Sequence, residues 1–486
     1  MNINQRAHNC DVAIASGDEG ELQKLSSELE VFLEGEVSRE HECAVHYLLG
    51  NLNAALSRIN NENATSWRDE KWSKYTALTI NHFREAKTIS ENEGSLYDGE
   101  IKANLANELS HQRRSLEAMD YWQLNASIGD ASCVSALSKG RELVFLSFYL
   151  NDQSHANLYQ YEAYVLFRNL RDNEAEITHP RILDTIQNED QVVSLLKFWD
   201  KSFETLDGWK NDCTGDSYSE DEKLYREWCL KNGLFANPIN DLTDQWIADQ
   251  DILQFPNHVV AVKDGPYFSA AFSALKREYC FARFMAFEGV HQMHPNYEGQ
   301  NMFLTDTLDS VHYEGSIEKI KTAFRVCFSV FDSLASLMNV YFGCNAKRVS
   351  FSSRWIRENL KDENNYFIDA LYWLSCDLSD VDLKKLGSKW KAPNPAAAEI
   401  RRVRNAIEHG WLRVAEFEET IWDSQNDFAY QINPQDLERH TMTLLQLVRS
   451  AMLYLCMAVV SKEKSKPKKE GGVFPVPINL VDDDFL

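Results

Sequence analysis

The chain contains few residues that break helices. Its 486 residues include only 20 glycines and 11 prolines. Because these two residues are the least compatible with a helix interior, their scarcity favours long helices joined by short connections. Hydrophobic residues make up 44% of the chain and charged residues 26%, which is typical of a globular protein with sizeable cores. The composition therefore predicts an all-α fold, and the length suits two or three domains.

The sequence also lacks a Cys-x-x-Cys pair, a secretory signal and an apolar run of membrane length. Its ten cysteines are scattered, and several lie in apolar helical stretches, so they predict small buried side chains in a reducing compartment. The N-terminus MNINQRAHNC has neither a basic start nor an apolar stretch. The longest strongly apolar run, residues 451–460, is shorter than the roughly 20 residues that span a bilayer. We expect a cytoplasmic protein with no membrane segment.

Positive charge is scarce as well, because the formal net charge is −24. Contact with nucleic-acid phosphates needs clustered Lys and Arg, so the surface as a whole is unsuited to non-specific nucleic-acid binding. A function directed at RNA must therefore rest on one local basic patch.

The N-terminal part, residues 1–171, predicts paired antiparallel helices. The stretch 101–131 resembles a tetratricopeptide repeat, with Leu105, Ala106 and Leu109 in its first helix and Ala118 and Trp122 in its second. His46–Gly50 with Phe83–Ala86 resembles a more degenerate copy, and segments 132–150 and 158–171 would continue the array. The resemblance implies a concave surface for a protein, peptide or nucleic acid. A plain helical hairpin is the alternative.

The remainder of the chain divides into three parts. Residues 172–265 predict a helical and irregular bridge, and residues 461–486 a flexible tail. Between them, residues 266–460 carry long amphipathic patterns that predict an antiparallel helical bundle. Its expected helices cover residues 269–290, 316–342, 366–378, 398–414 and 439–460, with Ile400, Val403, Ile407 and Val414 on the core face of the fourth.

One stretch of this bundle has the character of a functional motif, Arg404-Asn405-Ala406-Ile407-Glu408-His409. It resembles the signature of the HEPN superfamily of helical nucleases and nucleotide-binding proteins, an Arg followed after four to six residues by a His, often with Asn after the Arg. The motif lies on an amphipathic helix, after Pro395 as a helix-start signal. Between Lys389 and Arg413 there are six basic residues and two acidic ones. The likeness extends over roughly 225–460, and it includes a branch that carries N-terminal tetratricopeptide-like helices.

The resemblance implies a metal-independent endoribonuclease, since RNA supplies its own nucleophile in the 2′-hydroxyl. His409 would act as the general acid and base, because histidine titrates near neutral pH. Arg404 would hold the phosphate through its planar donor fork. Asn405 would bind the phosphate or orient the histidine, and Arg401 and Arg402 would position the RNA backbone. The implied products carry a 2′,3′-cyclic phosphate and a 5′-hydroxyl, and no cofactor is required.

Helix geometry complicates this site. Five residues on a regular helix turn through about 500°, so Arg404 and His409 project about 140° apart. HEPN proteins generally dimerise so that two motifs line one cleft, and we therefore expect a homodimer with a composite site. Asp332, on the predicted 316–342 helix, is a candidate contact of the motif, although a simple boundary carboxylate is the plainer interpretation.

Several alternatives remain open. Arg39 and His46 satisfy the same kind of spacing, so spacing alone carries no weight. Arg404 and His409 would be solvated helix-face residues if Glu408 paired with Arg404 at the i,i+4 position. His291 and His294 resemble a metal pair, but no nearby ligand pattern completes a site, and no metal is expected.

These interpretations of the motif lead to different functional hypotheses. The leading hypothesis is a nuclease that cleaves RNA, with tRNA as a candidate substrate, regulated by the N-terminal repeats in defence or stress as a toxin-like effector. The rivals are a non-catalytic dimeric adaptor and a nucleotide-binding regulator.

Overall fold

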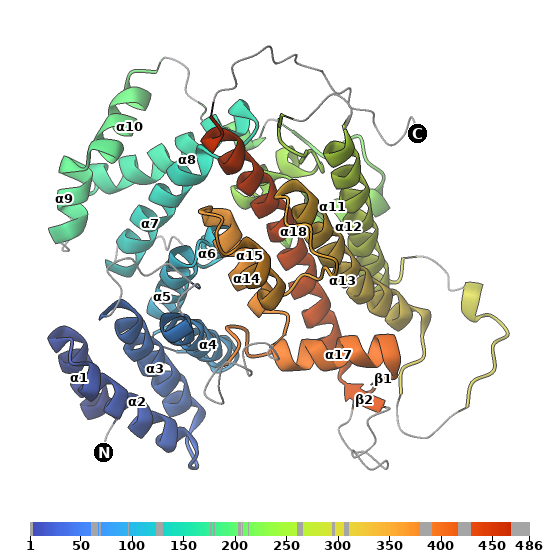
Figure 1. Ribbon diagram of the computed structural model, residues 1–486, viewed down its shortest axis with the longest axis horizontal. Helices are drawn as coiled ribbons and strands as arrows, with labels where there is room; N and C mark the ends of the chain where they lie inside the picture. Colours follow the sequence, from blue (N-terminus) through green and yellow to red (C-terminus); the bar gives the residue numbers. More distant parts are fainter. Residues whose placement is uncertain are drawn as a thin grey trace.

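The computed structural model describes residues 3–59, 67, 70–95, 97–122, 130–174, 177, 180–202, 206, 208–211, 213–259, 266–293, 297–305, 311–379, 391–416 and 429–467. Helices dominate this part of the chain, so the predicted all-α class is confirmed. Figure 1 shows the N-terminal helices (blue to teal) beside a C-terminal bundle (green to red). His294, Lys389 and the tail from residue 468 lie outside the described residues. The division into four regions stays a prediction.

The N-terminal helices follow one another as packed neighbours. Asp18 accepts a hydrogen bond from the Glu21 backbone N–H at 3.1 Å and so begins α2, and Asp152 caps α8 in the same way. The helices are α1 (Ile3–Ser16), α2 (Glu19–Leu33), α3 (Arg39–Ile59), α4 (Glu70–Glu93), α5 (Asp98–His111), α6 (Ser115–Tyr121), α7 (Asp130–Ser147), α8 (Gln153–Asp172), α9 (Pro180–Asn188) and α10 (Asp190–Asp200).

Two helix pairs pack in the same way, with a glycine of one helix against a phenylalanine ring of the other. A Cβ added at Gly50 of α3 would lie 2.4 Å from the ring of Phe83 on α4, and one at Gly140 of α7 would lie 2.4 Å from the ring of Phe167 on α8. Only glycine allows such close approach, so both pairs depend on it. Leu105, Ala106, Leu109, Ala118 and Trp122, the residues that suggested a repeat, are all buried. The assignment to the tetratricopeptide type stays a prediction.

The α3–α4 pair also encloses two histidines. The Nδ1 atoms of His46 and His82 are 3.0 Å apart, so one neutral ring donates a hydrogen bond to the other. Burial lowers the pKa of His46 to about 4 and that of His82 well below its ordinary value. Arg39 pairs with Glu42 at 3.0 Å on the surface. The structure therefore gives Arg39 and His46 separate structural contacts, in keeping with the lack of weight placed on their spacing.

The connecting region contains short helices and buried ion pairs. Its elements are η2 (Trp209–Asn211), α11 (Glu220–Lys231), η3 (Pro238–Asp241) and η4 (Trp246–Ala248). Asp251 pairs with Arg283 at 2.7 Å, and Asp241 pairs with Arg449 at 2.6 Å. These pairs fasten the region to the helices that follow.

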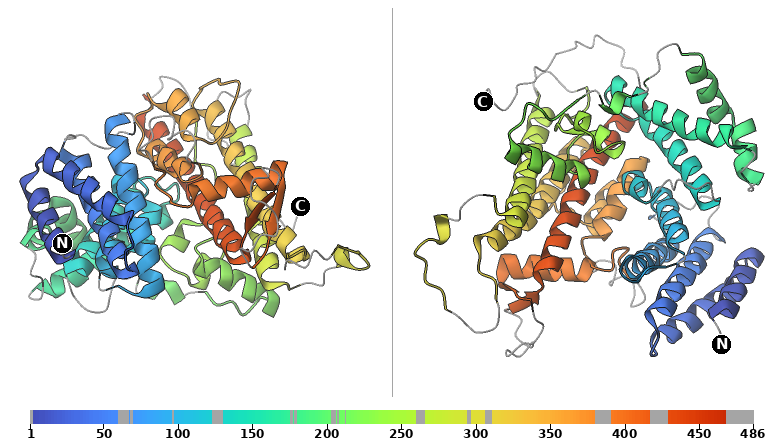
Figure 2. Two further views of the ribbon diagram at one scale, coloured as in Figure 1. Left: turned by 90° about the horizontal axis from the view of Figure 1, so that it is seen from below. Right: turned by 180° about the vertical axis from the view of Figure 1, so that it is seen from behind.

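The C-terminal bundle surrounds one nearly enclosed helix, α18. Its long partners α12 and α13 pack tightly, because a Cβ added at Gly289 of α12 would lie 2.5 Å from the Ile320 side chain of α13. The elements are α12 (Tyr267–His291), η6 (Tyr297–Gly299), α13 (Gly315–Tyr341), α14 (Ser353–Leu360), α15 (Tyr366–Cys376), α17 (Ala397–His409), β1 (Trp411–Val414), β2 (Ala429–Ile432) and α18 (Pro434–Ser465). Figure 2 shows the same arrangement from below and from behind.

Two of these helices are long and apolar enough to span a membrane by length and composition, namely α13 and α18. The most apolar window of α18 is 89% buried inside the protein and that of α13 is 56% buried. Burial at this level is what core helices of a globular bundle have, so packing accounts for their apolar character.

A buried ion network joins the N-terminal helices to the bundle. Asp377, which follows α15, is 1% exposed and accepts from Arg84 at 2.8 Å and from Arg114 at 2.7 Å. The two arginines lower the pKa of the Asp377 carboxyl, although burial alone would raise it. The Trp67 indole donates to Asp369 at 2.7 Å across the same junction. These contacts hold both halves of the chain together.

The helix predicted over residues 398–414 is shorter than expected. It ends at His409, and Trp411–Val414 form β1, which pairs in parallel with β2. Gly410 is a weak helix former and takes an extended conformation, and the bulky residues after it suit a strand. The placement of Val414 on the helical core face was therefore wrong. Val414 is buried, but from the strand.

Candidate functional site

The candidate site is built on α17, whose sequence gives it three different faces. Pro395 precedes the first turn, and Ile400, Val403 and Ala406 are buried against the bundle while Ile407 is partly buried. At about 100° per residue, Arg401, Arg404 and Glu408 share a second face, and Arg402, Asn405 and His409 a third. Figure 1 shows α17 lying next to β1, β2 and the beginning of α18. The motif residues are thus divided between the two polar faces.

Arg404 lies against α13. Its guanidinium carbon is 4.4 Å from the centroid of the Phe328 ring, and its Nη2 is 3.7 Å from Oδ2 of Asp332. The other oxygen of Asp332 accepts from the Phe351 backbone N–H at 3.0 Å, which holds the carboxylate in place. Asp332 is therefore in contact with the motif, contrary to the plainer interpretation of a boundary carboxylate.

The Arg404 side chain remains accessible despite these contacts. It is 44% exposed, and the side chain of Asp332 is 45% exposed. An ion pair this open contributes at most about 1 kcal/mol, so an incoming phosphate can compete for the guanidinium. The ring of Phe328 beneath it restricts the guanidinium without covering its donors.

Glu408 pairs with α13 as well. Its carboxylate is 3.2 Å from Nε of Arg325, whose Nη2 donates to the backbone carbonyl of Ile407 at 3.2 Å. Arg325 thereby stabilises the last turn of α17, where the carbonyls have no partner within the helix. The i,i+4 pair of Glu408 with Arg404, on which the solvated-face alternative relied, is replaced by this pairing between helices.

His409 and Asn405 point away from α13. Both are exposed, and neither makes a hydrogen bond or ion pair with any residue that the structure describes. The helix is regular from Ala397 to His409, so Arg404 and His409 do project about 140° apart. A single copy of α17 therefore does not direct both side chains at one small cleft.

The remaining predicted residues lie on the same helix. Arg402 is exposed beside the Tyr430 hydroxyl, which donates to Glu399 at 3.3 Å. The buried His440 is hydrogen-bonded to Glu399 at 2.8 Å, and this bond lowers the pKa of Glu399. Arg401 is half-buried. The structure places Arg402 with Asn405 and His409, and Arg401 with Arg404.

Sequence reasoning missed three contributors, Arg325, Phe328 and His440. Arg325, Phe328 and Asp332 are spaced by three and four residues on α13, which places them on one helix face. That spacing is a usable signal only once α17 is known to cross this face. His440 carries no local signal, because its partner Glu399 is 41 residues away.

No group of three or more His, Cys, Asp or Glu side chains suited to a metal ion occurs among the described residues. His291 stacks on the Phe287 ring with a centroid distance of 4.4 Å. The second member of the suspected pair, His294, lies outside the described part of the chain.

Comparison with known families agrees with the fold and with the predicted HEPN resemblance of the C-terminal region. Residues 259–462 match the family model described as LA2681-like HEPN. The C-terminal bundle is therefore a HEPN domain, as the sequence resemblance predicted. No curated protein and no solved structure matches the chain.

Proposed function

We propose that the protein is a metal-independent endoribonuclease whose reaction depends on Arg404 and His409. The observation that supports the proposal is the exposure of the Arg404 and His409 side chains and the contacts that they make. His409 is exposed at the end of α17 with no partner among the described residues, and Arg404 is oriented by Phe328 and Asp332 while staying accessible. If Arg404 and His409 had only a structural role, we would expect both side chains to be engaged in contacts within the protein.

The chemistry assigns one task to each side chain. The ribose 2′-hydroxyl attacks the adjacent phosphorus, the P–O5′ bond breaks, and the products are a 2′,3′-cyclic phosphate and a 5′-hydroxyl. His409 takes the 2′-hydroxyl proton or gives one to the leaving oxygen. Arg404 binds the phosphate and stabilises its developing charge. Asn405 shares the His409 face and contacts the same phosphate, while Arg401 and Arg402 hold neighbouring phosphates.

The catalytic unit in this proposal is a homodimer. Because Arg404 and His409 project about 140° apart on one helix, a cleft that needs both must receive them from two copies. A symmetric dimer would supply Arg404 from one α17 and His409 from the other, and would form two such sites.

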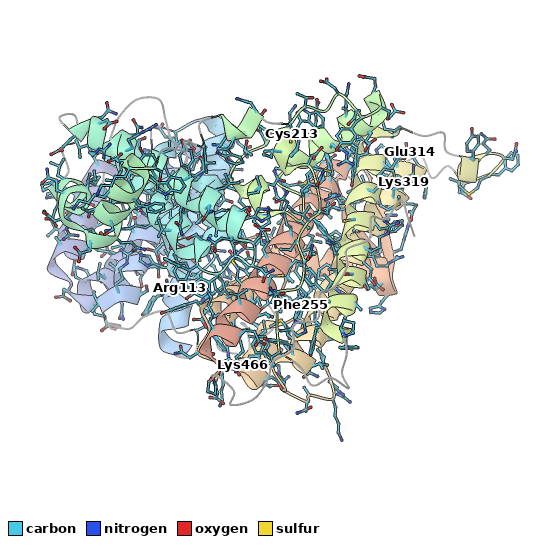
Figure 3. The ribbon with its side chains drawn as sticks, turned by 90° about the horizontal axis from the view of Figure 1, so that it is seen from above. Arg113, Cys213, Phe255, Glu314, Lys319 and Lys466 are labelled. Atoms are coloured by element: carbon cyan, nitrogen blue, oxygen red, sulfur yellow. The ribbon has the colours of Figure 1, made fainter. Side chains whose placement is uncertain are left out.

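The N-terminal helices supply a site for a regulating ligand. A groove of about 710 Å³ lies among α1, α3, α5 and α7, and its walls include Asn51, Asn104 and Arg113. The Asn104 amide nitrogen donates to Oδ1 of Asn51 at 3.1 Å, so a peptide backbone would bind to the Asn51 amide nitrogen and the Asn104 carbonyl oxygen. The Arg113 guanidinium is 4.5 Å from the Tyr366 ring on α15, so this groove touches the HEPN domain directly. Figure 3 labels Arg113 beside the bundle. A protein or peptide bound there would alter that contact.

The biological setting follows from family resemblance, namely RNA cleavage in the cytoplasm as a defence or stress response, with tRNA as a candidate substrate. The adaptor hypothesis is favoured by the same groove, because a binding surface does not need catalysis. A nucleotide-binding regulator would instead gain thermal stability from ATP or a dinucleotide.

The test incubates labelled tRNA and total RNA with the purified protein in EDTA, beside Arg404→Ala and His409→Ala. Arg39→Ala is the matched control, since Arg39 also precedes a histidine at similar spacing and is exposed. We expect cleavage with cyclic-phosphate ends from the wild type and the control only. Equal cleavage by all four proteins would refute the assignment of the motif. No cleavage by any of them would favour the adaptor.

A further inference from the structure

The strand that follows the motif begins with an exposed indole ring. Trp411, the first residue of β1, is separated from His409 by Gly410 alone and keeps 37% of its surface exposed. Gly410 has a φ of −141° and a ψ of −142°, which is an extended conformation, and two extended residues span at most about 7 Å. A group the size of one nucleotide that is bound at His409 can therefore also contact Trp411.

The two-stranded sheet directs this indole away from the protein core. Side chains alternate between the two faces of a strand, and Leu412 and Val414 occupy the core face of β1. Trp411 lies on the opposite face, where the register of the sheet pairs it with the exposed Ala429 of β2. Because Ala429 offers only a methyl group to cover the ring, the paired strand leaves the indole accessible.

The indole of Trp411 is also available for polar and aromatic contacts. Within the described part of the chain, Trp411 makes no hydrogen bond, no contact with another aromatic ring and no cation–π contact. An indole combines a large flat apolar surface with one N–H donor. Trp411 therefore offers both a stacking surface and a donor to a ligand.

Single exposed aromatic residues are common on protein surfaces, and the charges nearby distinguish Trp411. The chain carries a net charge of −24, yet Arg402 and Arg404 are exposed on α17. The two acidic residues of that helix, Glu399 and Glu408, are engaged by side chains of other helices at 2.8 and 3.2 Å. Cations that contact phosphates, next to an aromatic ring that contacts a base, are what sites for single-stranded nucleic acid contain. Charge and ring together favour RNA as the occupant.

We propose that Trp411 is a base-stacking residue of the RNA site, on which one base next to the cleaved phosphate packs. The inference rests on the proposed ribonuclease function and adds the means by which that site holds single-stranded RNA. Because Trp411 follows His409 in the chain, it accompanies this histidine whichever copy of the protein supplies Arg404. A base inside a duplex is covered by its neighbours on both faces, so the site accepts loops and single strands.

Binding of RNA that cannot be cleaved tests the stacking. The probe is a fluorescent single-stranded RNA with 2′-O-methyl riboses, which lack the attacking hydroxyl, beside a duplex of the same sequence. We expect Trp411→Ala to raise the Kd for the single strand about 10-fold, and Trp411→Phe, which keeps a ring, to raise it less than about 3-fold. Phe198→Ala is the matched control, because Phe198 is 61% exposed on α10 at the opposite side of the molecule (Figure 1).

Three results of the binding experiment overturn the proposal. The first is an affinity of Trp411→Ala equal to that of the wild type and of the Phe198→Ala control. The second is an equal loss in Trp411→Ala and Trp411→Phe, because a stacking role requires rescue by the remaining ring. The third is a wild type that binds the duplex as tightly as the single strand.

A photo-crosslink tests the contact in the unsubstituted protein. An iodinated uracil, placed at each position of the same RNA in turn, joins covalently under irradiation to an aromatic ring that stacks on it. We expect the wild type to give a crosslinked peptide that contains Trp411. Crosslinks confined to other peptides overturn the proposed contact, whether or not the Trp411 variants fold.

Cleavage distinguishes failure of this inference from failure of the proposed function. In single-turnover cleavage, an abasic ribose on one side of the cleaved phosphate should slow the wild type about 10-fold and should not slow Trp411→Ala further. If wild type and Trp411→Ala cleave equally fast, the stacking is refuted and the ribonuclease stands. If the wild type binds RNA through Trp411 and cleaves none, the stacking stands and the ribonuclease is refuted. A wild type that neither binds nor cleaves RNA refutes both.

Discussion

Substitution of Arg404 can distinguish a catalytic role from a structural one, because the contacts of this side chain contribute little to the stability of the folded protein. A cation–π contact at an exposed site contributes about 0.5–1 kcal/mol. The open ion pair with Asp332 contributes at most about 1 kcal/mol. Replacing Arg404 by lysine keeps the charge and part of both contacts, so the free energy of unfolding should fall by about 1 kcal/mol or less.

The expected effect of Arg404→Lys on cleavage is much larger. Lysine is a point charge and lacks the planar fork that binds two phosphate oxygens at once. Removing a preorganised donor from a site of developing charge costs roughly 10²–10³ in rate. We expect cleavage of labelled tRNA to slow by about 10²-fold, or about 2.7 kcal/mol of transition-state stabilisation.

The assay is single-turnover cleavage in EDTA with protein in excess, beside urea unfolding and light scattering of the same samples. Arg402→Lys, on the other polar face of α17, is the matched control and should lose less activity. If Arg404→Lys cleaves as fast as the wild type, bidentate phosphate binding is wrong. If it loses several kcal/mol of stability, Arg404 is primarily a structural residue.

Three further predictions concern stability, each measured by urea unfolding. The folded protein holds His46 with a pKa of about 4, so as the pH falls below about 6.5 the unfolded chain takes up a proton at this histidine before the folded protein does. The free energy of unfolding should therefore decline between pH 6.5 and 4, by up to about 3 kcal/mol from His46. The substitution His46→Gln should remove that part of the decline. Asp377→Asn leaves two arginines without their buried partner and should cost about 3–5 kcal/mol. Gly140→Ala forces a Cβ to within 2.4 Å of the Phe167 ring and should cost about 1–3 kcal/mol, whereas Gly99→Ala, with open space around it on α5, should stabilise by up to about 1 kcal/mol.

Each of these has a contradicting result. A His46→Gln protein with the same pH profile as the wild type would mean that the histidine pair does not resist protonation. An Asp377→Asn protein within 1 kcal/mol of the wild type would mean that Glu117, which pairs with Arg114 at 3.1 Å, and solvent compensate the two arginines. Equal effects of the two glycine substitutions would mean that the helix pair relaxes around the added carbon.

Much of the architecture could be predicted from local patterns. Scarce glycine and proline with apolar residues at helical spacing predicted the all-α class. The same spacing placed Ile400 and Val403 in the core and so turned Arg404 and His409 outward. Their angular separation is a property of a regular helix and was calculable from the sequence alone.

Pairings between distant segments were not predictable in this way. Arg325 and Glu408 are brought together by the crossing of α13 and α17. The alternative that paired Glu408 with Arg404 was wrong on this contact, because a partner on the same helix was the only one visible in the sequence. Residues 411–414 are compatible with helix or strand, and the strand forms because a second segment, 429–432, pairs with them.

The sequence by itself determined which side chains are candidates for the proposed chemistry and on which helix they lie, because helix periodicity and the identity of a motif are local properties. Only the tertiary structure decided which of these side chains contact other residues and which are exposed without a partner among the described residues. Packing placed Phe328 and Asp332 under Arg404, left His409 without a partner among the described residues, and paired Val311 with Ala415, just after the strand that follows the motif. Those outcomes depend on contacts between segments far apart in the chain, which no local pattern encodes.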